Sequence, residues 1–275
     1  MTVTIAAVAA APAGLAVAQP RSRGRDALVY TLQMWAFIVL HELPYDNRER
    51  IERRVHIAYP IACDRVLGLG VQPTLRLQRA FGRPGRTTAL DQALTWVHWA
   101  WFAEPHAAAA WILWRRRERF GRTAAMIGAL FDLGTIVYFA VPTAPPWWAA
   151  EEGRLPGVRR VMAEVGERFW GRLWSPLYDF LGGNPVAAMP SLHFATSVMA
   201  AKMLSEAGPV EGMVGWAYAG TLGFALVYLG EHYFVDLVAG LALTELVSRA
   251  APHAAPALLS VSRSVQALER RAWAA

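Results

Sequence analysis

Apolar segments of membrane-spanning length recur along most of this chain, and they constrain its fold more than any other feature. They start near residue 27 and continue to about residue 250 without a long polar linker. A helix of about 20 mostly apolar residues matches the hydrocarbon thickness of a bilayer. The composition agrees, because 55% of the 275 residues are hydrophobic and only 17% are charged. The sequence therefore predicts an all-α, polytopic membrane protein.

Six of these segments are expected to cross the membrane as one helical bundle. The expected spans are 27–43, 90–114, 123–141, 189–204, 213–229 and 233–247.

The bundle divides the chain into three parts. Residues 26–250 are expected to form a single membrane domain, and residues 251–275 a cytoplasmic C-terminal tail. Residues 1–25 are expected to be a poorly ordered or cytoplasmic N-terminal tail. Their apolar stretch at 3–17 resembles the core of a signal peptide but lacks a charged segment before it.

A basic cluster sets the expected orientation. Arg115–Arg119 holds four arginines directly after the second expected span, and such clusters stay on the cytoplasmic side. Residues 142–188 then lie outside, and the fourth and sixth spans both begin at the outer face. His193 and His232, which are 39 residues apart, are therefore expected at the same membrane depth. We predict an integral protein of the cytoplasmic membrane whose site faces the extracytoplasmic side.

The segment 45–88 differs from the spans because arginines alternate with aliphatic residues along it. Asp64-Arg65 in its middle argues against a span, so an amphipathic helix at the membrane interface is expected. The chain carries a net charge of +6, but its basic residues flank apolar segments instead of forming one soluble patch. This pattern favours a lipid bilayer over a nucleic acid as the partner.

The first candidate site element is Met189-Pro-Ser-Leu-His193, at the expected start of the fourth span. With Pro190 at the first helical position, the amides of Ser191 and Leu192 would point out of the helix end. Free amides at the positive end of a helix dipole bind anions such as phosphate. The Ser191 hydroxyl adds a further contact, and His193 is placed to donate a proton.

The second element is His232 and Asp236, at the start of the sixth span. Residues four apart share a helix face. A carboxylate beside an imidazole fixes its tautomer and leaves the other nitrogen free as a nucleophile. Each element alone is common as a helix cap or an interfacial histidine. Their occurrence on one side of the membrane favours a phosphate-handling site.

Together these motifs resemble the second and third signature motifs of the type 2 phosphatidic acid phosphatase superfamily. Val141-Pro-Thr-Ala-Pro-Pro146, Ala188-Met-Pro-Ser-Leu-His193 and Glu231-His-Tyr are similar to the inositolphosphotransferase branch, which contains inositol phosphorylceramide synthases. The resemblance covers roughly residues 90–250. It implies His232 as nucleophile, Asp236 as its orienting carboxylate, His193 as general acid, and a membrane lipid substrate without a metal or another cofactor.

The sequence departs from the phosphatase pattern at the cations. Leu192 stands where that pattern has Gly, and Leu226 stands where it has Arg. No basic residue occurs in 141–148, although cations neutralise charge in phosphoryl transfer. Candidate replacements elsewhere in the chain are Arg48, Arg50, Arg53, Arg54, Arg154, Arg168 and Arg172.

Several readings stay open at this stage. The missing bases match the inositolphosphotransferase branch. That resemblance implies transfer of a lipid phosphate or phosphodiester group to an alcohol, through a phosphohistidine, over hydrolysis of a lipid phosphate or a polyprenyl (pyro)phosphate. A proton-coupled transporter would use Glu104, His106 and Asp132 as a proton path, and a haem protein would use His193 and His232 as ligands. The single Cys63 excludes a multi-cysteine metal site. The sequence leaves the oligomeric state and the exact substrate open.

Overall fold

The computed structural model describes residues 2–20, 22–42, 53–176 and 184–274. Helices dominate this part of the chain, as expected, and the described residues include no extended strand. The longer elements are α1 (Thr2–Ala18), α2 (Arg23–Glu42), α6 (Ala89–Ala100), α7 (Glu104–Arg115), α8 (Arg117–Ala140), α12 (Leu192–Ala207), α13 (Pro209–Leu229) and α14 (Phe234–Ala274). The shorter elements are α4 (Ala58–Leu67), α5 (Pro73–Phe81), α9 (Pro146–Glu151), α10 (Val161–Trp170) and η2 (Gly171–Leu173).

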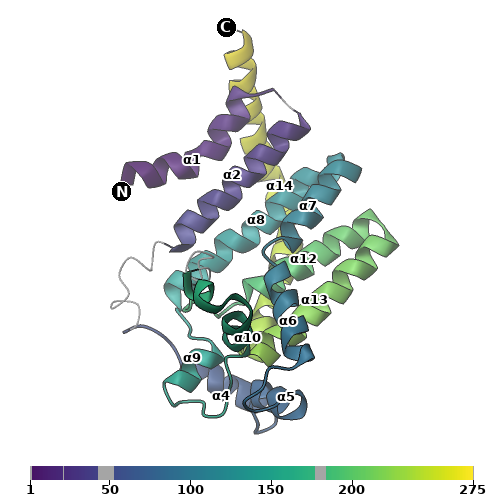
Figure 1. The fold of residues 1–275 in the computed structure, drawn as a ribbon. Coiled ribbons are helices and arrows are strands. Elements are labelled where there is room, and N and C mark those ends of the chain that lie inside the picture. Colours follow the sequence, from purple (N-terminus) through teal and green to yellow (C-terminus); the bar gives the residue numbers. More distant parts are fainter. Residues whose placement is uncertain (1, 21, 43–52, 177–183, 275) are drawn as a thin grey trace.

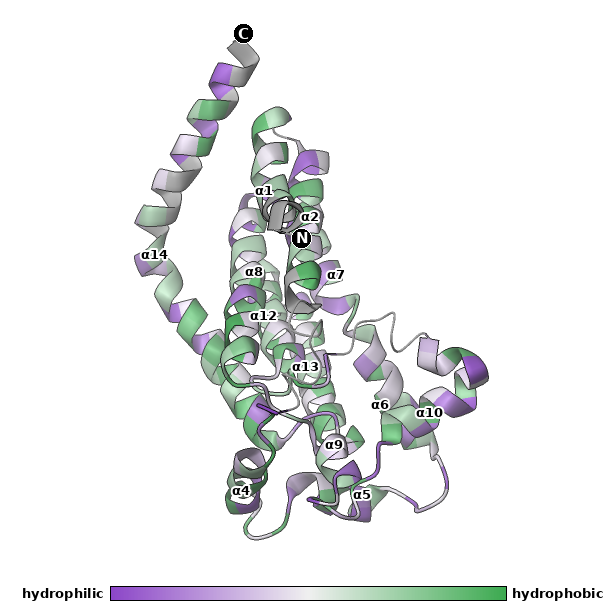
Figure 2. Cartoon of the chain, turned by 90° about the vertical axis from the view of Figure 1, so that its left-hand side faces the viewer, coloured by the Kyte–Doolittle hydropathy of each residue, from purple (hydrophilic) through white to green (hydrophobic). Residues whose placement is uncertain are grey.

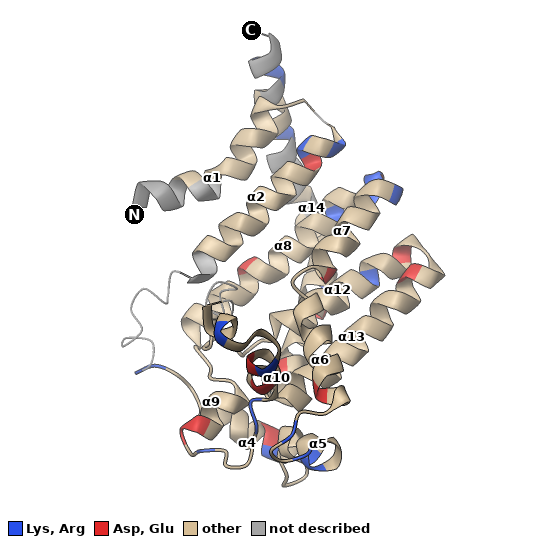
Figure 3. Ribbon diagram, viewed as in Figure 1, with Lys and Arg blue, Asp and Glu red and all other residues tan. Residues whose placement is uncertain are grey.

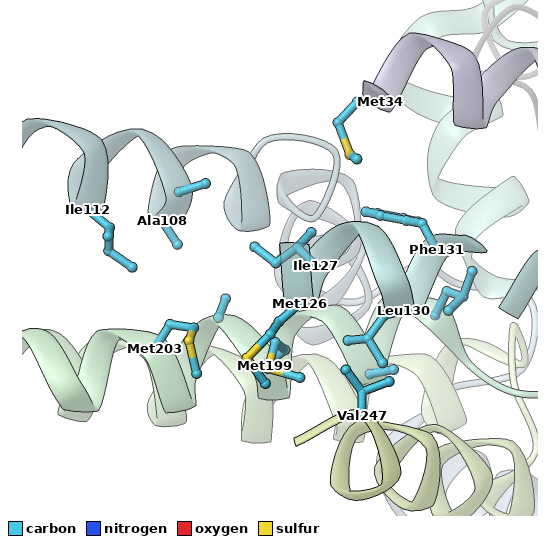
Figure 4. Close-up of a cluster of buried hydrophobic side chains, with 14 of the residues drawn as sticks. Met34, Ala108, Ile112, Met126, Ile127, Leu130, Phe131, Met199, Met203 and Val247 are labelled. Atoms are coloured by element: carbon cyan, nitrogen blue, oxygen red, sulfur yellow. The ribbon is translucent and has the colours of Figure 1, made fainter. Parts of the chain in front are cut away.

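Helix α12 lies at the centre of the bundle and packs against α7, α8, α13 and α14 (Figure 1). The main core forms where apolar residues one turn apart on neighbouring helices meet. Met126 and Leu130 of α8 face Met199 and Met203 of α12 in this cluster (Figure 4). Spacings of four residues put each pair on one face of its helix, so the core follows directly from the apolar pattern.

Large apolar side chains also cover the outside of the bundle. Ile136 of α8, Val214 and Trp216 of α13, and Leu241 of α14 are all exposed. The hydropathy colouring shows α12 and α13 as mainly apolar along their length (Figure 2). An apolar surface on an apolar core is what a lipid solvent requires. Of the described helices, α8 and α13 are long and apolar enough by themselves to cross a membrane.

The expected second span at 90–114 is two helices, and this prediction was wrong. Helix α6 ends at Ala100 and α7 begins at Glu104. Between them the amides of Trp101, Phe102 and Ala103 donate to carbonyls three residues earlier, which tightens the chain into a turn. Pro105 lacks an N–H and disfavours helix at the residue before it. The count of six uninterrupted spans is therefore not confirmed.

The segment 45–88 was expected to be one amphipathic helix. Its described part forms two short helices, α4 and α5, which lie with α9 at one end of the bundle (Figure 1). Residues 45–52 lie outside the described residues.

The expected N-terminal tail is helical. Residues 2–18 form α1, which packs against α2 and α14. The expected C-terminal tail continues α14, whose far half extends past the end of the bundle in Figure 2.

The basic cluster and the candidate site lie at opposite ends of the bundle. Arg122 of α8 forms an ion pair with Glu206 at the end of α12, with Nη1 2.6 Å from Oε2. The α7–α8 and α12–α13 turns therefore lie side by side (Figure 3). Helices α12 and α14 both begin at the other end, as the sequence predicted.

Three glycines let other helices approach the start of α12. A Cβ atom on Gly240 of α14 would lie 2.6 Å from the Ser191 carbonyl oxygen, and one on Gly134 of α8 would lie 2.5 Å from Leu192. A Cβ atom on Gly223 of α13 would lie 2.8 Å from the Phe194 ring. These distances are too short for any side chain, so the three helices contact the residues around His193 directly.

Candidate active site

His232 lies in the short turn between α13 and α14. Gly230 ends α13 in the left-handed conformation, with φ 83°, which glycine adopts without strain. The amides of Glu231 and His232 then both donate to the Leu226 carbonyl, at 3.1 Å. This compact turn points the imidazole of His232 back towards α12.

The hydrogen bonds of His232 assign its tautomer. Its Nδ1 atom lies 3.0 Å from the Ala188 carbonyl oxygen and 3.3 Å from Oδ2 of Asp236. Both partners are acceptors, so Nδ1 carries the proton and Nε2 presents a lone pair. Asp236 is fully buried in the first turn of α14, and its Oδ2 also accepts the Tyr233 amide at 2.8 Å.

Burial keeps His232 neutral. It lowers the pKa of His232 from 6.5 to about 4, and the Ala188 carbonyl opposes this only in part. A neutral imidazole with a free Nε2 is the form that a nucleophile needs.

His193, in the first turn of α12, meets His232 across the site. The Nδ1 atom of His193 lies 3.1 Å from Nε2 of His232. Because Nε2 of His232 holds the lone pair, His193 is the donor in this contact. The ring of Trp101, in the α6–α7 turn, packs on His193 with centroids 4.1 Å apart. The break in the second span thus contributes a wall of the site.

The start of α12 differs from the expected anion cradle. The helix begins at Leu192, and Ser191 is its N-cap, whose Oγ accepts the Phe194 amide at 3.3 Å. The Ser191 amide donates to the Asp236 carbonyl at 3.0 Å. The Tyr138 hydroxyl donates to the Pro190 carbonyl at 2.8 Å and also interacts with the backbone of Leu192. The two amides are therefore not free, contrary to the prediction from the sequence. Ser191 joins the start of α12 to the start of α14, and Leu192 contacts Tyr138 of α8.

Asp64 of α4 is a functional contact that the sequence did not reveal. Its Oδ2 accepts the Phe234 amide at 2.9 Å, and its Oδ1 accepts the Val235 amide at 2.8 Å. Asp64 is fully buried, and burial raises its pKa to about 6. A side chain 170 residues away in the sequence therefore caps the helix that carries Asp236.

The two histidines open into a cavity of about 610 Å³. Its walls come from α2, α6 to α10, the segment 184–188 and the start of α12, and they are mostly aromatic and aliphatic. His98 of α6 also lines the cavity, and sequence reasoning gave it no role. One helical turn separates it from Trp101, but nothing in the sequence marks that face of α6.

The candidate phosphate-binding arginines do not meet the histidines. Within the described ranges, no arginine or lysine lines the cavity. Arg53, Arg54, Arg154, Arg168 and Arg172 are all exposed, and Arg48 and Arg50 lie outside the described residues.

A different cation approaches the edge of the cavity. The Cζ atom of Arg160 lies 3.5 Å from the ring centroid of Trp147, which lines the cavity beside Glu231. Burial raises the pKa of Glu231 to about 7, and the positive charge of Arg160 lowers it in part. Arg160 directly precedes α10 and was not among the predicted cations.

The residues expected of a transporter are separated from one another. Glu104 binds Ser197 at 2.9 Å, His106 binds Tyr30 at 2.9 Å, and Asp132 is exposed on α8. These contacts join helices pairwise and form no continuous proton path among the residues that the structure describes.

The candidate catalytic residues lie within a match to a known protein family. The profile of the PAP2 superfamily matches residues 61–251, which include His193, His232 and Asp236. The chain belongs to the PAP2 superfamily. The resemblance noted from the sequence is thereby confirmed.

Curated relatives point to one branch of this superfamily. The chain is 31% identical over 125 residues to the inositol phosphorylceramide synthase catalytic subunit aur1 of Schizosaccharomyces pombe, covering 44% of this chain and 30% of the relative. It is 28% identical over 176 residues to an inositol phosphorylceramide synthase of Candida albicans, covering 58% and 35%. The chain spans about a third of the length of these relatives. No solved structure matches it.

Proposed function

We propose that this PAP2 superfamily member is an integral-membrane lipid phosphotransferase that works through a phosphohistidine. The observation that carries the proposal is the line from His193 through His232 to Asp236 at the inner end of an apolar cavity. A lipid phosphodiester enters the cavity with its phosphorus atom next to Nε2 of His232.

In the first step, Nε2 of His232 attacks phosphorus and a P–N bond forms. The P–O bond to the leaving alcohol breaks, and His193 gives that oxygen a proton. Phosphorylation makes the His232 ring positive. The buried carboxylate of Asp236 and the Ala188 carbonyl stabilise that charge through Nδ1–H.

In the second step, an acceptor alcohol loses its proton to His193 and attacks phosphorus. The P–N bond breaks, and the phosphoryl group leaves as a new ester. The names of the relatives, which are synthases, favour an alcohol acceptor over water. The site lies at the end of the bundle opposite Arg115–Arg119, which supports an extracytoplasmic position.

The test is turnover by the purified protein in lipid nanodiscs. Lipid phosphates and lipid phosphodiesters are offered with and without alcohol acceptors, and acid-labile phosphate on the protein is trapped. His232→Ala should abolish turnover and trapping, whereas His253→Ala, an exposed histidine far along α14, should change neither. Full activity in His232→Ala overturns the mechanism. Product release that no alcohol diverts identifies a phosphatase.

A further inference from the structure

The cavity contains a third histidine that the scheme above does not use. His98 is 5% exposed, and its ring centroid lies 4.9 Å from that of His193 at an angle of 33°. Its Nδ1 atom is buried and has no hydrogen-bond partner. An unpaired polar atom in an apolar wall is costly, and a hydrogen bond to a bound ligand is one reason for a native structure to retain it.

The proposed reaction requires a hydrogen-bond donor near the phosphoryl group, and His98 is placed to supply one. Charge on the non-bridging oxygens of a transferring phosphoryl group requires hydrogen-bond donors or cations. The described cavity wall carries no arginine or lysine. The amides at the start of α12, the other expected donors, already have partners.

Three other polar groups of the wall are committed to protein partners. Trp101 Nε1 donates to Thr196 at 2.9 Å, His106 binds Tyr30, and the Tyr138 hydroxyl donates to Pro190. His98 has no such commitment at Nδ1, and it lies on the same side of the cavity as the general acid.

Helix α6 holds His98 firmly in place. Its start is fixed by a reciprocal cap in which Thr88 and Asp91 each accept the other's amide, at 2.7 and 3.1 Å. The Tyr228 hydroxyl of α13 also donates to Asp91. His98 occupies the last turn of α6, and its carbonyl accepts the Trp101 amide that starts the turn to α7. Such a rigid mounting suits a group that must meet one oxygen position.

We propose that His98 is a phosphoryl-binding residue, whose imidazole N–H donates to a non-bridging oxygen of the substrate phosphate. It takes the part that a guanidinium plays where the superfamily pattern has arginine. The inference rests on the proposed function, since it assigns a role within the same site.

The experiment compares three substitutions of His98 with a control on the same helix. His98→Phe keeps the planar shape and removes the donor, whereas His98→Asn and His98→Gln keep a donor near the Nδ1 and Nε2 positions. Thr95→Val is the control, because Thr95 is fully buried on α6 and bonds only to the Asp91 carbonyl. Turnover, inhibition by orthovanadate and thermal stability are measured for each variant.

His98→Phe should lower kcat/KM by about 10²-fold or more, in the range for one lost oxyanion donor. It should also weaken inhibition by orthovanadate at least tenfold. One of the two amide variants should recover part of both losses, and Thr95→Val should match the wild type. Equal orthovanadate inhibition of His98→Phe and the wild type overturns the inference, as does equal loss in all three His98 variants with a matching fall in Tm.

The inference and the proposed function fail separately. A wild-type protein that turns over no lipid phosphate or phosphodiester overturns the proposed function. Its binding of orthovanadate, followed by ⁵¹V NMR line broadening, still decides whether His98 contacts the anion. Binding that His98→Phe reduces supports the contact, and binding that it leaves unchanged overturns it.

Discussion

The Nδ1 atom of His193 lies 3.1 Å from Nε2 of His232, so the proposed acid and nucleophile are hydrogen-bonded to each other. In the proposed mechanism, this contact occupies the lone pair that attacks phosphorus. Substrate must therefore separate the two rings and bring its phosphorus atom between them. The same proton that His193 now directs at His232 is then directed at the leaving oxygen.

Replacing the acid should slow esters with poor leaving groups most. His193→Gln removes the proton donor, and general acid catalysis contributes about 10²–10⁴-fold. We expect a loss of that order with an alkyl phosphodiester and a loss of less than about tenfold with a nitrophenyl ester, whose leaving group needs no proton. Rate constants for single turnover of both substrates provide the measurement. Equal losses with the two leaving groups contradict the assignment.

Replacing the orienting carboxylate should change the rate more than the fold. In Asp236→Asn, the amide can turn its N–H towards Nδ1 of His232 and favour the wrong tautomer. The loss in kcat should be on the order of 10²–10⁴-fold, as in other His–Asp pairs. Circular dichroism and size-exclusion chromatography in detergent check that the bundle persists. An active Asp236→Asn protein would show that the carboxylate serves folding alone.

The tautomer of His232 is directly measurable. ¹⁵N NMR of histidine-labelled protein should show Nδ1–H with an unprotonated Nε2 from about pH 5 to 8, because burial lowers its pKa to about 4. In the unfolded chain the pKa is near 6.5, so unfolding takes up a proton between these values. His232 therefore reduces stability as the pH falls through that window and has no effect above it. Titration near pH 6.5 in the folded protein contradicts this.

The close approach of α14 to α12 predicts a sharp difference between two glycines. A Cβ atom on Gly240 would lie 2.6 Å from a backbone oxygen, whereas one on Gly220 would have nothing within 4 Å. Gly240→Ala should lower stability by about 1–3 kcal/mol, the usual cost of overpacking. Gly220→Ala should leave Tm unchanged or slightly raised. Thermal unfolding in detergent measures both, and similar Tm values for the two variants contradict the packing.

The single cysteine is a natural labelling site for testing the orientation of the bundle in the membrane. Cys63 is exposed on α4, at the end of the bundle that holds the site. A membrane-impermeant maleimide should label it in right-side-out vesicles, and Cys63→Ser should abolish the label. Arg116→Cys in the Cys63→Ser background should be labelled only after permeabilisation. The opposite pattern would place the site on the cytoplasmic side.

Local patterns in the sequence were sufficient to predict the site elements at the starts of α12 and α14. Proline, serine and histidine before one apolar run, and a His–Asp pair four residues apart before another, follow from helix geometry. The basic cluster then placed both at one end, and the contacts of His193 with His232 agree with this. The length of the apolar segments also predicted α8, α12 and α13, whose ends differ from the expected spans by a few residues.

Long-range contacts explain what the sequence could not show. The amide of Ser191 looked free because its partner, the Asp236 carbonyl, lies 45 residues away. The roles of His98 and Asp64 depend on which face of α6 or α4 meets the site, and neither face carries a local signal. The break at Trp101 was missed because apolar residues continue to Ala103, and Glu104 and Pro105 directly after it also fall within the expected span.

Asp64 accepts hydrogen bonds from the first two amides of α14, and this limits how far the protein can be shortened without loss of activity. All three proposed catalytic side chains lie beyond residue 190, yet the helix that carries Asp236 is completed by a carboxylate from α4. A fragment starting at α6 would retain every motif and still leave the Phe234 and Val235 amides without their acceptor. The superfamily match starts at residue 61, just before Asp64. Any shortened version of the protein must therefore keep the surface helix α4 together with the motifs.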